Sequence, residues 1–432
     1  MSASAQVFQQ ANPHALASII DASATRSIVA SQDIYDDRGN KLWARDQSVS
    51  NSLQQRLLER RLKRPLESCL RVEDGITTSQ LHAALTSFFE RGHALARAIQ
   101  PWAQILCEEV TRLALPASVQ LLLTTLQATR PSAFDHAVRG MALAGALQAS
   151  VRPERYDLRL AMLGGLLHDL GEMYVNPVHL CGSQRLDMAG YRHVVTHPRI
   201  GELLLAIMTD YPPALVRAIG EHHERFDGTG YPMRRSGNSI SPLGRLLAVM
   251  ETALATSEAP TAPLTRTSFA LRMVTGEYDV QWLSLVSSAA WREQEDAEAV
   301  VCDKTGELIV HLALIDTELA MARDQALALV EKAGVSALVR DVAAKVASAM
   351  HRLRVGWNST GSWGVLQPDG SPQSRVELTI ARDEMRFRMR CIERDCLWPH
   401  AELSAEDAAH LSVLWDDRSS GELLSPVECL VA

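Results

Sequence analysis

The stretch Glu221-His222-His223-Glu224-Arg225-Phe226-Asp227-Gly228-Thr229-Gly230-Tyr231-Pro232 is the most informative part of the chain. Adjacent histidines are uncommon by chance, and neutral imidazoles beside carboxylates are the ligands that borderline cations such as iron, manganese or zinc prefer. The doublet His168-Asp169 and the isolated His197 come before it. This order predicts a helical bundle that holds a buried site for two metal ions.

The candidate metal ligands all lie in one region of the chain. In order they are His136, His168, Asp169, His197, His222, His223 and Glu251. The doublet falls in residues 163–170, an otherwise apolar segment that we expect to be helical, and a carboxylate buried there is costly unless a cation or hydrogen bonds compensate it. A single histidine such as His136 is more often a hydrogen-bonded core residue. The set as a whole favours metal ligation.

The spacing of apolar residues predicts helices around these ligands. Between residue 80 and about residue 257 they recur at intervals of three and four, and prolines interrupt the pattern repeatedly. Short helices of an α-bundle fit this pattern. A second helical block is expected at 278–355, with good periodicity in 308–329 and 335–353.

The two ends of the chain have a different pattern. Residues 27–46 predict two short strands around the turn 36–40, and helical spacing with many basic residues follows at 49–64. After Gly356, the segments 362–370, 375–380 and 385–390 look like strands, and apolar and polar residues alternate in the last two. We therefore expect four segments, at 1–79, 80–277, 278–355 and 356–432.

Composition narrows the class of protein. Of 432 residues, 47% are hydrophobic and 22% are charged, the net charge is −8, and no apolar run approaches the roughly 18 residues of a membrane helix. The N-terminal residues lack the pattern of a secretory signal. Seven scattered cysteines indicate reduced thiols, and a zinc site at Cys391, Cys396 and His400 would have an unusually wide spacing. We expect a cytoplasmic protein without membrane insertion or stable nucleic-acid binding.

The array of ligands resembles the HD-GYP branch of the HD phosphohydrolases. His168-Asp169 matches the signature doublet of that family, and 227–232 matches the stretch that gives the branch its other letters. The resemblance covers about residues 133–256. It implies a mainly α fold, an HD-type helical bundle, here with a small N-terminal β-hairpin module and a small mixed α/β C-terminal region. The usual substrate of the family is the bacterial second messenger cyclic di-GMP.

The resemblance also implies a role for each matched residue. Asp169 would bridge two divalent ions, iron or manganese with zinc as the alternative. One ion would take His136, His168 and Glu251, and the other would take His197, His222 and His223. Asp169 and Glu172 are the expected catalytic residues. The expected substrate loop consists of Asp227, Gly228, Gly230, Tyr231 and Pro232, with the two glycines in backbone conformations closed to other residues.

Four positions depart from the family pattern. Glu172 stands where the family usually has lysine; it either replaces a cation that contacts phosphate or, on the helix face of His168, ligates metal. Glu251 replaces an aspartate. Ser132 stands where members with a third metal have glutamate, so we expect at most two ions. The segment 258–263 lacks the basic residues with which some members hold the nucleotide.

These observations leave three functions open. The first is a metal-dependent phosphodiesterase that hydrolyses cyclic di-GMP to pGpG or GMP. The second is a degenerate HD-GYP module that acts as a signalling or interaction protein, and the third is a dimetal hydrolase for another nucleotide phosphate. The expected partners are a cyclic dinucleotide and either a second copy of the chain or a signalling protein.

Overall fold

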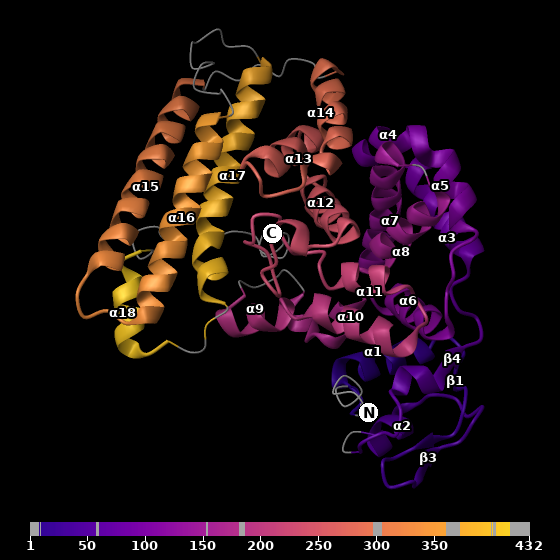
Figure 1. Cartoon of the computed structure of the whole chain (residues 1–432). Coiled ribbons are helices and arrows are strands. Elements are labelled where there is room, and N and C mark those ends of the chain that lie inside the picture. The colour runs from indigo at the N-terminus through magenta and orange to yellow at the C-terminus, as the bar shows by residue number, and fades with distance from the viewer. Residues whose placement is uncertain are drawn as a thin grey trace. The chain divides into compact units, whose positions relative to one another are not determined.

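A computed structural model describes residues 8, 10–57, 60–152, 154–180, 186–296, 305–359, 372–398, 400 and 403–414. The chain divides into two compact units (Figure 1). The first consists of Met1–Leu180 and His193–Leu254, and the second of Cys181–Arg192 and Ala255–Ala432. The four segments expected from the sequence stay predictions.

The first unit begins with a small module of short strands and helices. Its elements are α1 (Pro13–Ser23), β1 (Ile28–Ala30), β2 (Ile34–Tyr35), β3 (Lys41–Trp43), α2 (Asn51–Leu57), the 3-10 helix η2 (Leu66–Cys69) and β4 (Leu70–Val72). β2 and β3 pair antiparallel, which confirms the predicted hairpin, and β1 pairs with β4. Asp36 holds the hairpin turn because its Oδ1 accepts a hydrogen bond from the Asn40 amide at 2.7 Å. The helix expected across 49–62 ends at Leu57, and Arg61 and Leu62 form isolated bridges instead.

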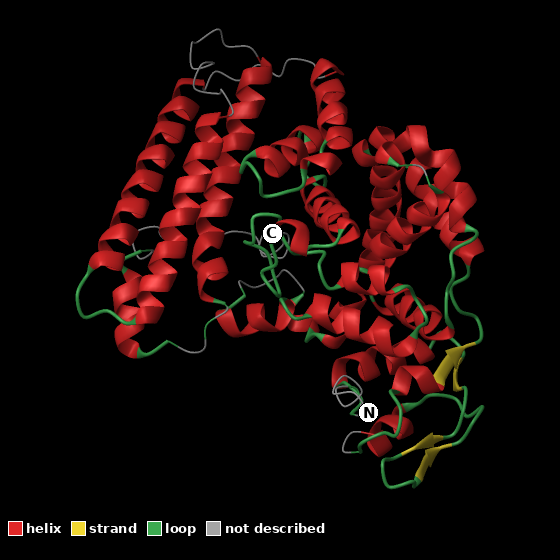
Figure 2. Cartoon of the chain, viewed as in Figure 1, coloured by secondary structure: helices red, strands yellow, loops and turns green. Residues whose placement is uncertain are grey.

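The rest of the first unit is helical, as predicted (Figure 2). Its elements are α3 (Thr78–Glu90), α4 (Ala94–Ile99), η3 (Gln100–Trp102), α5 (Ala103–Val110), α6 (Ala117–Thr129), α7 (Pro131–Val151), α8 (Arg155–Leu167), η4 (Leu170–Tyr174), η5 (Pro177–His179), α10 (His197–Met208), α11 (Pro213–Ile219), η6 (Gly237–Ser239) and α12 (Pro242–Thr256). Proline stands in the first turn of α7, α10 and α11, where it costs no hydrogen bond.

The helices α7 and α8 cross in direct backbone contact. A Cβ atom at Gly165 would lie 2.2 Å from the Gly140 carbonyl oxygen, and one at Gly140 would lie 2.6 Å from the Gly165 oxygen. Only glycine allows this approach. The crossing matters for the site because α7 carries His136 and α8 leads directly into His168.

The second unit is a helical bundle. Its elements are α13 (Pro263–Arg272), η7 (Val280–Trp282), α14 (Ser284–Asp296), α15 (Thr305–Glu331), α16 (Ala337–Ser359), α17 (Pro372–Leu397) and α18 (Ala405–Ser412), and α9 (Met188–Val194) begins in it. α15, α16 and α17 lie side by side (Figure 1). Their shared core includes Leu319, Val346, Trp357 and Met385. The predicted helices at 308–329 and 335–353 are confirmed.

The predicted strands at 375–380 and 385–390 are wrong, because both segments belong to α17. The described C-terminal region is therefore helical and not mixed α/β, while the strand expected at 362–370 lies outside the described residues. The described strands all lie between Ile28 and Val72 (Figure 2). Within the part of the chain that the structure describes, no helix combines the length and apolar character needed to cross a membrane.

Candidate metal centre

The candidate ligands lie at the ends or on the inner faces of separate elements of the first unit. His136 lies in α7, His168 caps α8 and Asp169 follows it, His197 begins α10, His222 and His223 follow α11, and Glu251 lies in α12. The fold thus brings together side chains that are far apart in the sequence. All of the predicted ligands are among them.

The doublet was expected to lie within one helix at 163–170, but it does not. α8 ends at Leu167, and Asp169 has φ −98° and ψ 9°, from which the chain continues as η4. η4 packs tightly on α10, because a Cβ atom at Gly171 would lie 2.0 Å from the His197 carbonyl oxygen. This change of direction turns Asp169 toward the α10 histidine.

The first group of donor atoms comprises His136, His168, Asp169 and Glu251, and these atoms lie within 4.8 Å of one another. His168 Nε2 lies 3.2 Å from His136 Nε2, 3.0 Å from Asp169 Oδ2 and 3.1 Å from Glu251 Oε2. His168 and Glu251 are buried. Two imidazoles and two carboxylates therefore converge on one point.

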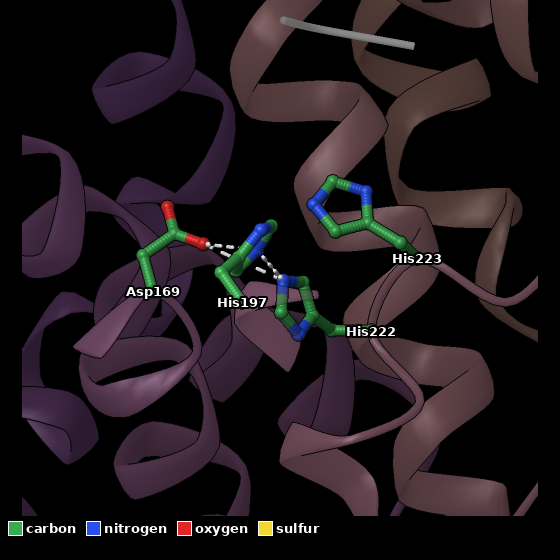
Figure 3. A group of neighbouring side chains, drawn as sticks. All are labelled: Asp169, His197, His222 and His223. Carbon is green, nitrogen blue, oxygen red and sulfur yellow. Dashed lines mark hydrogen bonds and ion pairs between the residues drawn. The ribbon is translucent and has the colours of Figure 1, made fainter. Parts of the chain in front are cut away.

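The second group comprises Asp169, His197, His222 and His223, again within 4.8 Å (Figure 3). His197 Nε2 lies 3.0 Å from His222 Nε2, and these two nitrogens lie 3.3 and 3.4 Å from Asp169 Oδ1. Asp169 belongs to both groups. Its Oδ2 faces the first and its Oδ1 faces the second, which is the arrangement of a carboxylate between two cations.

The orientation of the imidazoles suits metal binding. The Nδ1 atoms of His168, His197 and His222 lie 2.9, 2.8 and 2.7 Å from backbone carbonyl oxygens. Because a carbonyl can only accept, each Nδ1 carries a hydrogen, and each ring turns its Nε2 atom toward the cluster. Glu251 Oε2 is also turned into the cluster, 3.1 Å from His168 Nε2 and 3.6 Å from His136 Nε2. Nε2 atoms and carboxylate oxygens that converge in this way suit a divalent cation.

Burial and charge set the protonation of these side chains. Burial disfavours charged His168, but the Asp169 and Glu251 carboxylates outweigh it and raise its pKa well above the ordinary value. Burial alone would raise the pKa of Asp169, yet its histidine partners hold that pKa well below the usual range. Burial lowers the pKa of His222 and, more strongly, that of His223. Asp169 is therefore ionised and His223 neutral, the forms that bind metal.

The expected substrate loop lies against the second group. The ring of Tyr231 stacks on His223 with centroids 4.5 Å apart, and the Asp227 carboxylate accepts hydrogen bonds from the Thr229 amide and hydroxyl. Gly228 has φ +82°, as expected. Gly230 does not have a positive φ; it is required because a Cβ there would lie 2.3 Å from the His223 carbonyl oxygen.

Two carboxylates beside the histidine pair have roles that the sequence did not reveal. Glu224 is buried and accepts hydrogen bonds from the amides of Met233 and Arg235 at 2.7 and 2.9 Å, and burial raises its pKa to about 7. Glu221 is also buried and pairs with Arg235. They anchor the loop after Pro232. The symmetric pattern Glu-His-His-Glu at 221–224 was the sequence feature that could have pointed to these roles.

Glu172 belongs to neither group of donor atoms. Its Oε2 lies 3.4 Å from Nη1 of Arg130, the residue directly before α7. No sequence pattern pointed to Arg130, since it lies 42 residues from Glu172 in the chain. In the described part of the chain, the donor clusters that could hold an ion do not include Cys391, Cys396 or His400.

Comparison with known proteins places this cluster in a family. The family model described as "HD domain" matches residues 120–278, which include every candidate ligand. "Cyclic di-GMP phosphodiesterase PA4108" of Pseudomonas aeruginosa is 33% identical over 175 residues, 40% of this chain and 42% of the relative. The chain carries an HD-GYP family domain. "3'3'-cGAMP-specific phosphodiesterase 3" of Vibrio cholerae is 36% identical to it over 86 residues, 20% of this chain and 18% of the relative.

The similarity is confined to part of each protein. The chain spans about two fifths, 42%, of the length of the Pseudomonas aeruginosa relative. A "Cyclic di-GMP phosphodiesterase" of Vibrio cholerae is 35% identical over 91 residues, 20% of this chain and 18% of the relative.

Proposed function

We propose that this chain is a metal-dependent phosphodiesterase that hydrolyses cyclic di-GMP to pGpG or GMP. The observation that carries the proposal is the pair of donor groups that share Asp169. The names of the relatives, which include cyclic di-GMP phosphodiesterases of two bacteria, support the substrate class.

In this proposal each donor group holds one divalent ion. His136, His168 and Glu251 would hold the first, His197, His222 and His223 would hold the second, and Asp169 would contribute to both. Iron or manganese suits this mixture of imidazole and carboxylate, with zinc as the alternative. When bound, the two ions would supply an ionised water near neutral pH and neutralise charge on the phosphoryl oxygens.

The protein's own residues orient this chemistry. The backbone carbonyls that accept from Nδ1 of His168, His197 and His222 fix the direction of each Nε2. Asp169 holds its two oxygens toward the two groups as the catalytic carboxylate that links them. Glu172 acts beside it, next to Arg130. Tyr231, stacked on His223, forms part of the rim against which a nucleotide would lie.

A related cyclic dinucleotide is the alternative substrate. One relative is named for 3'3'-cGAMP, which has the same phosphodiester ring with a different base. The donor groups described above would contact metal and phosphate, so they would not distinguish the bases. The cytoplasmic location and the pairing with a second copy or a signalling protein stay predictions.

The test is a substrate panel with the metal-loaded protein. Cyclic di-GMP, 3'3'-cGAMP and bis(p-nitrophenyl) phosphate are incubated with protein purified without oxygen and loaded with iron or manganese, and products are separated by chromatography. We expect linear pGpG or GMP from cyclic di-GMP as the preferred product. Faster hydrolysis of 3'3'-cGAMP would identify it as the preferred substrate in place of cyclic di-GMP. If the metal-loaded protein cleaves none of the three compounds, the enzymatic function is refuted.

A further inference from the structure

Arg130, which was not among the predicted site residues, lies beside the candidate metal centre. Arg130 precedes α7, and its Nη1 lies 3.4 Å from Glu172 Oε2. Glu172 lies in η4, three residues after Asp169, and the charges of Asp169, His197 and Arg130 all influence its carboxyl group. Arg130 is therefore linked to the metal centre through one side chain.

The guanidinium of Arg130 has an unused donor. Its Nη2 atom is buried and has no hydrogen-bond partner among the described residues, although 24% of the side chain is exposed. A buried N–H group without a partner costs free energy, so such groups are rare in folded proteins. The planar guanidinium also presents its N–H groups in a fork that matches two oxygens of a phosphate. Nη1 is anchored and Nη2 remains available for an acceptor.

The charge of the centre calls for such a donor. Asp169, Glu172 and Glu251 bring three carboxylates to it. A phosphodiester is an anion, so its approach to these carboxylates must be balanced by positive charge close to the phosphate as well as by any bound ions. The guanidinium of Arg130 is a fixed positive charge that an ion pair already joins to this group.

We propose that Arg130 binds a phosphate group of the substrate and that Glu172 is the positioning residue that holds its guanidinium. The inference rests on the proposed phosphodiesterase function for the identity of the ligand. It assigns Glu172 a role different from metal ligation: Glu172 accepts from one edge of the guanidinium and leaves Nη2 to the phosphate.

The experiment compares Arg130→Ala, Arg130→Lys and Glu172→Gln with a matched control, Arg159→Ala. Arg159 is also partly buried and its Nη1 also lies 3.4 Å from a carboxylate, Glu109 Oε2, which keeps Arg112 and Arg155 as partners. For each metal-loaded protein, titration calorimetry gives the dissociation constants of cyclic di-GMP and inorganic phosphate. Metal content and KM and kcat are measured on the same samples.

We expect Arg130→Ala to weaken binding of both probes roughly tenfold or more, the effect of losing a charge-assisted hydrogen bond. KM should rise by a larger factor than kcat falls, and the metal content should not change. Arg130→Lys should recover part of the affinity. Glu172→Gln should weaken binding less, and adding it to Arg130→Ala should have no further effect, since it acts through the guanidinium.

Unchanged binding in Arg130→Ala, or an equal loss in Arg159→Ala, would overturn the inference. If Arg130→Ala does not fold, the comparison of Arg130→Lys and Glu172→Gln with the wild type decides in its place, and wild-type affinity in both would overturn it. Binding without hydrolysis would remove the phosphodiesterase function and leave the inference standing. A wild-type protein that binds neither probe would remove the inference itself.

Discussion

His197 Nε2 and His222 Nε2 lie 3.0 Å apart while the Nδ1 of each ring lies within 2.8 Å of a backbone carbonyl oxygen. Both rings therefore turn their Nε2 atoms toward the same point. Two lone pairs at this distance repel each other unless a proton or a cation lies between them. The carbonyls of Val194 and Ile219, the last residues of α9 and α11, thus hold an arrangement that a metal ion would stabilise.

The two donor groups should lose metal independently. His136→Ala removes a ligand of the first group alone, and His222→Ala removes one of the second group alone. We expect each variant to retain about one ion per chain and Asp169→Ala to retain neither, because Asp169 belongs to both groups. Mass spectrometry of the purified proteins gives the ratio. Equal metal content in all three variants would argue against two adjacent sites.

Replacing Gly165 should destabilise the first unit. A Cβ atom there would lie 2.2 Å from the Gly140 oxygen and 2.8 Å from the Met141 nitrogen, so the α7 and α8 backbones must separate. We expect Gly165→Ala to lower the free energy of unfolding by about 1–3 kcal/mol, the usual cost of overpacking. Urea denaturation followed by circular dichroism measures it.

Gly164→Ala is the matched control for this change. A Cβ atom at Gly164 would meet side-chain atoms of Leu247 at 3.1 Å, and a leucine side chain can move more easily than a backbone. Its cost should therefore be clearly smaller than that of Gly165→Ala. Equal unfolding free energies for the two variants would mean that the α7–α8 crossing tolerates a side chain.

The helices at 80–257 could be predicted from the sequence, whereas α17 could not. The apolar spacing of 80–257 was long enough to predict helices. Residues 375–380 alternate like a strand when taken alone. In α17, however, five of the residues that pack in the core recur at helical intervals, namely Leu378, Ala381, Met385, Ile392 and Cys396. Arg388 of the same helix pairs with Glu384, one turn earlier. The alternation of six residues was too short a pattern to decide between the two structures.

Stability should depend on pH through Glu67. This carboxyl is buried and accepts a hydrogen bond from the Tyr174 hydroxyl at 2.5 Å, and burial raises its pKa above the ordinary 4.5. Between 4.5 and the raised value, the folded protein holds a proton that the unfolded chain has released, so this group lowers stability as pH rises through that range. Glu67→Gln keeps an acceptor and cannot ionise.

We therefore expect the stability of Glu67→Gln relative to the wild type to increase with pH above 4.5 and then to level off at the folded-state pKa. Urea denaturation of both proteins between about pH 5 and pH 8 measures the difference. Parallel curves, with a constant difference at every pH, would show that Glu67 has the same pKa in the folded and unfolded states.

Exchanging the charges of the Arg130–Glu172 ion pair should change the stability of the protein. Glu172→Lys places two cations side by side, and since both side chains are partly exposed we expect a loss of about 1 kcal/mol or less. The double variant Arg130→Glu/Glu172→Lys should recover most of it, as measured by thermal unfolding. A loss of bound metal in Glu172→Gln, which keeps the shape of the side chain, would instead identify Glu172 as a ligand.

Much of the candidate site could be predicted from the order of its residues. The doublet, the lone His197 and the histidine pair predicted the ligands that the structure brings together. Arg130 and Glu172 could not be paired in this way, because their contact depends on where α7 begins relative to η4. The anchoring of the loop by Glu224 also depends on amides nine and eleven residues away.

Turnover of cyclic di-GMP tests the dimetal phosphodiesterase directly. It is measured on protein purified without oxygen and loaded with iron or manganese, with bound metal quantified on the same sample. The wild type should hold about two ions per chain and form the linear dinucleotide or GMP. The His168→Ala/Asp169→Ala variant should hold neither ion and form no product, while its helix content stays nearly unchanged. Full turnover in that variant would contradict a dimetal phosphodiesterase centred on Asp169.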